Sequence, residues 1–365
     1  MNFEAQREVI LKPLQAVIGV VERRQTMPIL ANILMVVKDG KLSLTATDLE
    51  VELVASAEVT AKQDGEITVP GRKFLDICRA LPEGAKISFE SSGERATVRS
   101  GRSRFTLATL AATEFPSVEE INAQQTVGLA QKDVKRLLEK THFAMAHQDV
   151  RYYLNGLLLE MEEKMLRGVA TDGHRLAMCE LVLDGGPSGH QQVIVPRKGV
   201  LELQRLLAEE GGVELVIGTN HVRAQLGDIR FTSKLVDGRF PEYGRVIPED
   251  TANTVQADKG SLKQALNRAA ILSNEKYRGI RLDLKENAVT IQAHNPEQEE
   301  AEEHLEVNYG GDELEIGFNV NYLLDALGAV EGEDVAIGLS DSNSSCLIEA
   351  PGDTTCKYVV MPMRL

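Results

Sequence analysis

A histidine and a run of glutamates are the residues whose types could most readily perform chemistry. His174 stands in the string TDGHR, and six glutamates fall within residues 297–306. A catalytic histidine needs a nucleophile or a carboxylate at a recognisable spacing, and none accompanies His174. A metal-dependent nuclease needs carboxylates that converge from several elements, whereas these glutamates follow one another on one short segment. We therefore expect no catalytic residue and keep a metal-dependent nuclease only as an alternative.

No motif for a bound nucleotide, metal or other cofactor occurs in the chain. The strings GxGxxG, Walker A and GxSxG are absent. Cys78, Cys179, Cys346 and Cys356 show neither a CxxC spacing nor a nearby histidine pair, which argues against zinc and favours reduced structural thiols. The start has no signal-peptide pattern, and no run of about 18 apolar residues occurs. We expect a cytoplasmic protein with no cofactor, no metal and no membrane association.

The elements that carry these residues occur three times. The string VPGRKFLDICRAL (69–81) returns as VPRKGVLELQRLL (195–207) and more faintly as FNVNYLLDALGAV (318–330), at spacings of 126 and 123 residues. TDLEVEL at Thr47 and TDGHRLA at Thr171 keep nearly the same spacing. A period of this length is a whole domain, because solenoid and propeller units repeat every 20–50 residues or so. We expect three domains, at residues 1–122, 123–250 and 251–365.

Each repeat is expected to contain a helix followed by three strands, twice. Apolar residues at helical spacing predict first helices over residues 7–22, 131–146 and 259–273, and the three repeated strings supply the second helices. Short alternating runs predict strands, which in the first repeat are residues 29–38, 41–48, 49–59, 86–90, 95–100 and 103–110. This order indicates an α+β fold, with the two helices of each domain packed on antiparallel sheets.

The charge is distributed unevenly along the chain. The net charge is −15. Residues 1–122 contain 15 Lys and Arg and 17 Asp and Glu, residues 123–250 contain 16 and 18, and residues 251–365 contain 9 and 20, so most of the negative charge lies in the third repeat. The first repeat ends with Arg95, Arg99, Arg102 and Arg104, and further basic residues gather on the predicted helices. Each run is open to the ordinary interpretation of a solvated face. The alternatives are a basic helical surface for phosphates and head-to-tail association of copies, which closes into a ring when the rotation permits.

Several strings resemble the bacterial sliding-clamp family, the β subunits of DNA polymerase III. They are HQDVRYYLNG (147–156), ATDGHRLA (170–177), FTSKLVDGRFPEY (231–243), RAAILSNEKYRG (268–279), NPEQEEAEE (295–303) and the terminal YVVMPMRL. The similarity runs from Phe3 to Leu365 and includes the threefold repeat. It implies a head-to-tail ring dimer with helices inside and sheets outside. The ring would encircle duplex DNA without reading its sequence and would tether a polymerase without catalysis of its own.

The resemblance also implies three sets of site residues. Those that contact DNA would be Arg24, Arg72, Gln148, Tyr152 and Tyr153. A groove for short apolar linear motifs, between the second and third domains, would be lined by Leu154, Thr171, Gly173, His174, Arg175, Leu176, Pro241, Arg245, Val246, Asn319, Tyr322, Asn343, Ser345, Met361, Pro362, Met363 and Arg364. The ring interface would include Phe105, Ile271 and Leu272, with Arg102, Arg104, Glu299, Glu300 and Glu303 as charged partners.

The partners that the resemblance implies are double-stranded DNA, a second copy of the chain and proteins with linear motifs. These proteins are the polymerase α subunit, the subunits of an ATP-driven clamp loader, translesion and repair polymerases, ligase and mismatch-repair proteins. Asn343 stands where an apolar groove residue is expected, so the motif preference is expected to shift. A variant clamp acting in drug resistance would share nearly all these motifs and stays an alternative.

Overall fold

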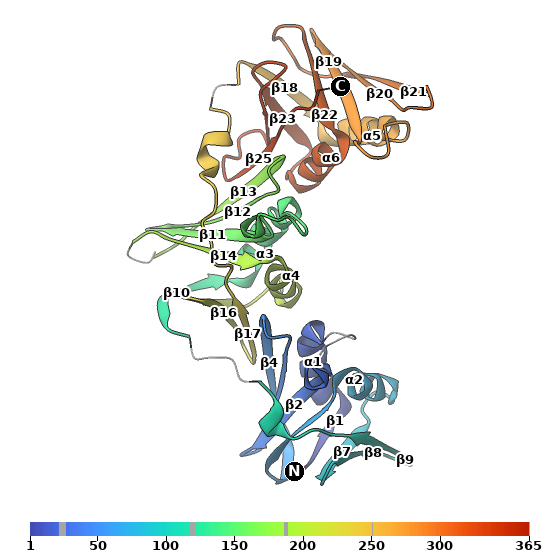
Figure 1. Ribbon diagram of the computed structural model, residues 1–365, viewed down its shortest axis with the longest axis vertical. Coiled ribbons are helices and arrows are strands. Elements are labelled where there is room, and N and C mark those ends of the chain that lie inside the picture. Colours follow the sequence, from blue (N-terminus) through green and yellow to red (C-terminus); the bar gives the residue numbers. More distant parts are fainter. Residues whose placement is uncertain (22–26, 117–120, 186–188, 250, 365) are drawn as a thin grey trace. The chain divides into compact units, whose positions relative to one another are not determined.

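The computed structural model describes residues 1–21, 27–116, 121–185, 189–249 and 251–364. It contains two compact units, residues 1–135 with 198–235 and residues 136–197 with 236–365 (Figure 1). Each unit therefore takes strands from two neighbouring sequence repeats. None of the helices in the described ranges is both long and apolar enough to cross a membrane.

Six α-helices form within the described chain, where the apolar spacing and the repeated strings predict them. They are α1 (Arg7–Val17), α2 (Gly71–Ala80), α3 (Gln131–Glu139), α4 (Arg197–Leu206), α5 (Lys259–Ala270) and α6 (Val320–Ala329). The prediction is confirmed in number, but α3 is shorter than expected. The Thr141 hydroxyl donates to the Leu137 carbonyl at 2.6 Å, and the chain continues as the 3-10 turn η4 (His142–Ala144).

The first unit contains two antiparallel sheets. The order of the five-stranded sheet is β5-β1-β7-β8-β9, and that of the eight-stranded sheet is β10-β15-β16-β17-β4-β3-β2-β6. The strands are β1 (Asn2–Gln6), β2 (Asn32–Lys38), β3 (Lys41–Thr47), β4 (Val51–Glu58), β5 (Thr60–Gln63), β6 (Gly65–Pro70), β7 (Lys86–Ser92), β8 (Arg95–Ser100), β9 (Ser103–Ala108), β10 (Ala123–Ala130), β15 (Gly212–Gly218), β16 (His221–Leu226) and β17 (Ile229–Lys234).

The second unit has the same plan with the smaller sheet at the other end of the sequence. Its eight-stranded sheet has the order β14-β11-β12-β13-β25-β24-β23-β18, and its four-stranded sheet has the order β21-β20-β19-β22. The strands are β11 (Gly156–Glu162), β12 (Met165–Thr171), β13 (Arg175–Val182), β14 (Gln191–Pro196), β18 (Asn253–Asp258), β19 (Gly279–Lys285), β20 (Ala288–His294), β21 (Glu300–Glu306), β22 (Leu314–Asn319), β23 (Asp334–Leu339), β24 (Cys346–Glu349) and β25 (Cys356–Val360).

The expected three strands per helix are in fact four. The fourth strand precedes each helix: β6, β14 and β22 lie before the second helices and were not counted, and β1, β10 and β18 lie before the first helices and were missed. Each of the strands β1, β10 and β18 pairs with the strand that follows the second helix, as Phe3 pairs with Phe89. The Phe3 and Phe89 rings stack at 5.2 Å, and Phe74 of α2 packs edge-on against Phe89. A strand opposite each helix pair is therefore needed to complete the core.

The helices pack on the sheets within each unit. In the first unit α1 lies beside α2 and packs on β3 and β4, and in the second unit α5 lies beside α6 and packs on β20 and β21 (Figure 1). The buried side of α1 carries Ile10, Leu14 and Val17, each fully buried. These contacts agree with the α+β class.

The cysteines differ from the sequence expectation. Cys179 on β13 and Cys356 on β25 are bonded to each other in a disulfide, so the prediction of four reduced thiols is wrong for this pair. Cys78 and Cys346 are free and buried, as expected of structural thiols. The pair could not be recognised from the sequence because 177 residues separate its members and only the pairing of β13 with β25 brings them together.

Candidate partner-binding groove and DNA-facing residues

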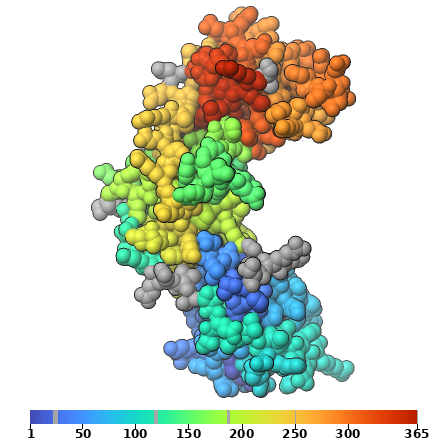
Figure 2. Space-filling view, in the orientation of Figure 1, coloured from blue at the N-terminus to red at the C-terminus, as the bar shows by residue number. Residues whose placement is uncertain are grey.

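A groove of about 670 Å³ opens on the surface of the second unit. It is lined by Arg151, Tyr153, Leu154, Thr171, Gly173, Arg175, Leu176, Pro241, Glu242, Tyr243, Arg245, Val246, Ile247, Pro248, Glu249, Ser340, Asn343, Ser344, Ser345, Val359 and Met361. Most of the predicted groove residues are in this set. The segment around residues 241–249, yellow in Figure 2, lies on the surface of the unit.

The floor of the groove is apolar because buried residues of a hydrophobic core form it. Leu176 on β13 faces Val359 on β25, and both belong to a buried cluster that includes Phe240. Val246 and Met361 remain about half exposed at the rim, at 52% and 49%. An apolar floor with a few polar groups around it is typical of a site that binds a small molecule or a short peptide.

The TDGHR string forms a tight turn at one side of the groove. The Thr171 hydroxyl donates to the Arg175 carbonyl at 2.6 Å, and the Asp172 carboxylate accepts the backbone N–H of His174 at 2.9 Å. Gly173 has a φ of +88°, and a Cβ there would lie 3.1 Å from the Arg151 guanidinium. Thr171 and Asp172 therefore stabilise the turn, and Thr47 and Asp48 make the same contacts in the first repeat.

Six predicted groove residues lie outside this lining: His174, Asn319, Tyr322, Pro362, Met363 and Arg364. His174 stacks on Tyr322 at 6.5 Å between ring centroids, and Asn319 caps α6 through the backbone N–H of Asn321. The chain end runs past them, since the Met361 N–H donates to the His174 carbonyl at 3.0 Å and the Met363 N–H to Gly317 at 2.8 Å. These contacts place Met363 beside β22 and His174 beside α6, and the groove lining itself ends at Met361.

The sequence interpretation missed several lining residues, most of them in the segment 242–249. Glu242, Tyr243, Ile247, Pro248 and Glu249 line the groove because this segment crosses the face of the sheet instead of forming a strand. The string FTSKLVDGRFPEY ends at Tyr243, and the resemblance implies no role for that residue. Val359 was missed because it reaches the groove through the pairing of β25 with β13, and Ser340 and Ser344 were missed because they lie in the loop between β23 and β24.

The residues predicted to contact DNA are placed as follows. Arg24 lies outside the described residues. Arg72 is exposed on α2, and its guanidinium donates to the Val21 carbonyl at 2.5 Å. Gln148 is exposed with a φ of +57°. Tyr152 is 58% exposed, whereas its neighbour Tyr153 packs on the groove cluster, so the two adjacent tyrosines face different surroundings.

Many of the basic helix residues already have partners in the chain. Arg136 and Lys140 form ion pairs with Glu331 at 2.9 and 3.2 Å, and Lys259 donates to the Val330 carbonyl at 2.8 Å. Arg268 pairs with Glu303 at 2.7 Å. These side chains therefore stabilise the fold as well as adding positive charge.

The predicted interface residues lie on or next to two edge strands and just after α5. Arg104 and Phe105 lie on β9, with Arg102 just before it, and Glu300 and Glu303 lie on β21; both strands have one neighbour in their sheets. Glu299 closes the turn before β21 through hydrogen bonds with Asn295. Ile271 is 74% exposed just after α5, and Leu272 is half-buried.

The glutamate run does not gather into a metal site. Glu300, Glu302 and Glu306 alternate with less exposed residues along β21, so they form the charged face of an edge strand. Among the described residues, the only group of three His, Cys, Asp or Glu side chains with converging ligand atoms is Glu160, Glu162 and His190. The glutamate run, which suggested a metal-dependent nuclease, therefore does not support that alternative.

Comparison with known proteins decides the family. Residues 1–119, 128–242 and 244–364 match the N-terminal, central and C-terminal domains of the DNA polymerase III beta subunit. The chain belongs to this family. It is 56% identical to the beta sliding clamp of Pseudomonas putida and 55% identical to that of Escherichia coli K12, over the full length of each chain.

Solved structures give the same result. The DnaN sliding clamp of Pseudomonas aeruginosa, in a crystal structure with griselimycin bound, is 56% identical and superposes with a TM-score of 0.98 over all of both chains. The pol III beta protein of Caulobacter crescentus, at 38% identity, superposes with a TM-score of 0.95 over the same extent. The chain is thus a sliding clamp, a non-catalytic processivity factor in DNA replication and not an enzyme.

Proposed function

We propose that two copies of the chain join head to tail into a ring around duplex DNA, so that the DNA is held by topology. The supporting observation is the way in which the chain joins its own repeats. β4 of the first repeat pairs with β17 of the second, and β13 of the second pairs with β25 of the third. In the third repeat, β21 is the strand equivalent to β4 and β13, and in the first repeat, β9 is the strand equivalent to β17 and β25. Both β21 and β9 are edge strands, so β21 of one copy would pair with β9 of a second copy.

The strand register predicts which residues would meet at this third junction. Residues that pair across successive strands form a row, and the repeat makes three such rows equivalent. On β6, β2, β3, β4 and β17 the row is Thr68, Leu34, Thr45, Val54 and Arg230, and on β14, β11, β12, β13 and β25 it is Ile194, Leu158, Val169, Met178 and Lys357. On β22, β19, β20 and β21 the row is Gly317, Arg281, Gln292 and Glu302, and it ends there within one chain. The next residue in the third row would be Arg104 of the second copy. An arginine opposite Glu302 stabilises the pairing, since opposite charges across strands attract.

Duplex DNA inside such a ring needs only weak contacts. We propose that Arg24, Arg72, Gln148 and Tyr152 contact the DNA, with Tyr153 shared between this surface and the groove. Arginine contacts to phosphates carry no sequence information and weaken with salt, which suits sliding. The overall charge of −15 limits adhesion to DNA outside the ring.

The groove is proposed to bind short apolar linear motifs of partner proteins. They are the replicative polymerase α subunit, clamp-loader subunits, translesion and repair polymerases, ligase and mismatch-repair proteins. Griselimycin is bound in the crystal structure of the Pseudomonas aeruginosa relative, and this chain is proposed to bind it as well. We further propose a cytoplasmic location and domain limits near residues 122 and 250.

A cysteine pair tests the head-to-tail junction. By the register above, Glu303 on β21 takes the place of Cys179 on β13, and Ser103 on β9 takes the place of Cys356 on β25. The variant Ser103→Cys with Glu303→Cys should therefore form a covalent dimer on oxidation. The control variant carries Arg104→Cys with Glu303→Cys. Because Arg104 follows Ser103 on β9 and adjacent strand residues face opposite sides of the sheet, its cysteine should point away from the one at position 303, and cross-linking should be poor. Equal cross-linking of the two variants, or none of the first, would reject this register.

A further inference from the structure

The wall of the groove formed by residues 241–249 is not part of any sheet. It contains one 3-10 turn, η6 (Tyr243–Val246), so no strand ladder fixes its position. Val246 and Arg245 line the groove while their side chains stay largely exposed, with Arg245 at 83%. The chain leads into this segment from Val236, whose N–H donates to the Ile194 carbonyl at 2.8 Å. The wall must therefore be held by side chains.

Tyr243 supplies such a contact. Its ring packs against the cluster that forms the groove floor, together with Val236 and Ile247. Its hydroxyl donates to the Glu160 carboxylate and accepts from the Arg167 guanidinium at 2.8 Å. Both hydrogen-bonding capacities of the hydroxyl are thus directed at the sheet.

The two residues that hold Tyr243 belong to a row of charges across three strands. Glu160 on β11 lies opposite Arg167 on β12, which lies opposite Glu180 on β13. Arg167 donates to Glu160 at 2.6 Å and to Glu180 at 2.7 Å. The neighbouring row on this face is apolar and consists of Leu158, Val169 and Met178. Side chains of residues 241–249 therefore pack on the apolar row, and the Tyr243 hydroxyl bonds to the charged row.

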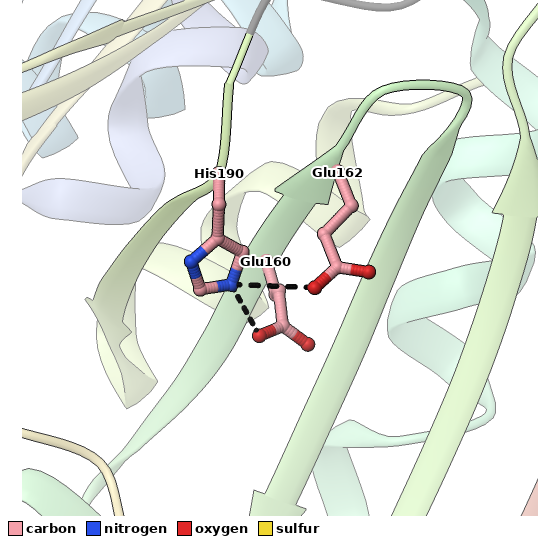
Figure 3. Close-up of side chains that lie close together, drawn as sticks. All are labelled: Glu160, Glu162 and His190. Carbon is pink, nitrogen blue, oxygen red and sulfur yellow. Dashed lines mark hydrogen bonds and ion pairs between the residues drawn. The ribbon is translucent and has the colours of Figure 1, made fainter.

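The carboxylate beneath Tyr243 is almost completely buried, with Glu160 only 4% exposed. Its other oxygen accepts from Gln192 and from His190 Nε2, the latter at 2.8 Å. A Glu162 carboxylate oxygen lies 3.5 Å from the same nitrogen, and Figure 3 shows how the three side chains lie together. Burial raises the pKa of Glu160, but the hydrogen bonds from Tyr243, His190, Gln192 and Arg167 outweigh it and lower the pKa to about 2. Because Glu160 already accepts four donors, including a guanidinium, the three residues form a hydrogen-bonded support and not a cation site.

We propose that the Tyr243 hydroxyl, clasped by Glu160 and Arg167, is a positioning group that holds residues 241–249 against the sheet in the conformation that receives partner motifs. The proposal rests on the proposed function of the groove. If the hydrogen bonds of the Tyr243 hydroxyl are lost, residues 241–249 should adopt the binding conformation in a smaller fraction of the molecules. The apparent Kd rises by the inverse of that fraction.

Tyr243→Phe removes the hydroxyl and keeps the ring. The probe is a fluorescently labelled peptide with the motif of the polymerase α subunit, and its binding is followed by fluorescence polarisation. We expect the Kd to rise about fivefold or more. Hydrogen exchange should quicken within residues 241–249. Tyr309→Phe is the matched control, because it removes another buried hydroxyl of the same unit, bonded to the Asp312 carbonyl. It should leave the Kd unchanged.

A double-mutant cycle separates positioning from a general loss of structure. Val246→Ala removes a wall contact, so its effect on the Kd should be smaller in the Tyr243→Phe background than in the wild type. Additive effects, or a wild-type Kd for Tyr243→Phe, would overturn the proposal while leaving the groove intact. If the wild-type protein itself fails to bind the peptide, the proposed function of the groove fails.

Discussion

Cys179 and Cys356 lie directly opposite one another on β13 and β25 and are joined by a disulfide. The bond therefore crosses the strand pair that joins the second repeat to the third. The same two strands carry Leu176 and Val359 into the groove floor. A covalent link within three residues of the groove ties its two central strands together.

Thiol counting checks this disulfide. Burial raises the pKa of the Cys78 and Cys346 thiols to about 12, so neither should react in the native protein. Protein purified without reductant should expose two thiols per chain on unfolding, and four after reduction. Four thiols on unfolding without reduction would show that Cys179 and Cys356 are not bonded.

The repeated turn offers a test of backbone strain. Leu49 has a φ of +77° in the same Thr-Asp turn in which Gly173 has +88°. The Thr47 hydroxyl donates to the Val51 carbonyl as Thr171 does to Arg175. Since glycine adopts this φ without strain, Leu49→Gly should raise the free energy of unfolding by about 0.5–1 kcal/mol.

The converse substitution is the control for that turn. Gly173→Ala should lower the free energy of unfolding, because it adds strain and crowds Arg151. Chemical denaturation measures both variants. A destabilised Leu49→Gly would mean that the leucine side chain matters more than the backbone.

Glu331 predicts a pH dependence. The hydrogen bond from Arg136, followed by that from Lys140, lowers its pKa to about 2 against the effect of burial. A carboxylate with a lowered pKa adds stability above its unfolded value, which is about 4.5, and loses it as the pH falls toward 2. Glu331→Gln should therefore be less stable at pH 7, by less than about 1 kcal/mol because the side chain is half exposed.

The difference between Glu331→Gln and the wild type should disappear as the pH falls from about 4.5 to 2. Denaturation across this range measures it, with Glu333→Gln, an exposed neighbour, as the control. A difference that stays constant with pH would assign the effect to packing instead of charge.

Asn343 is expected to set motif preference. It lies on the groove wall, and its backbone N–H donates to the Asp341 carboxylate at 2.7 Å, a bond that a substitution would keep. Asn343→Val should tighten binding of a motif with an apolar side chain at the adjoining position, about three- to tenfold. Ser342→Val, in the same turn but outside the lining, should have no effect. Equal affinities for all three proteins would remove Asn343 from recognition.

The sequence predicts those features that depend on neighbouring residues. Helical periodicity predicts the first helix of each repeat, the repeated strings predict the second, and the repeated TD strings mark the turns at Thr47 and Thr171. It does not reveal the pairing of β13 with β25, because antiparallel partners so distant in sequence leave no local pattern. The same reason hides the support of Tyr243, whose partners Glu160 and Arg167 lie 83 and 76 residues away.

Retention on circular DNA tests the central claim most directly. The protein is loaded by its matching clamp loader and ATP onto a nicked circular plasmid, and bound protein is measured before and after the plasmid is cut to a linear form. The ring account predicts that the protein stays on the circle and leaves the linear DNA by sliding off its ends. Equal retention on both forms would contradict it, since the protein would then hold DNA by contact and not by enclosure.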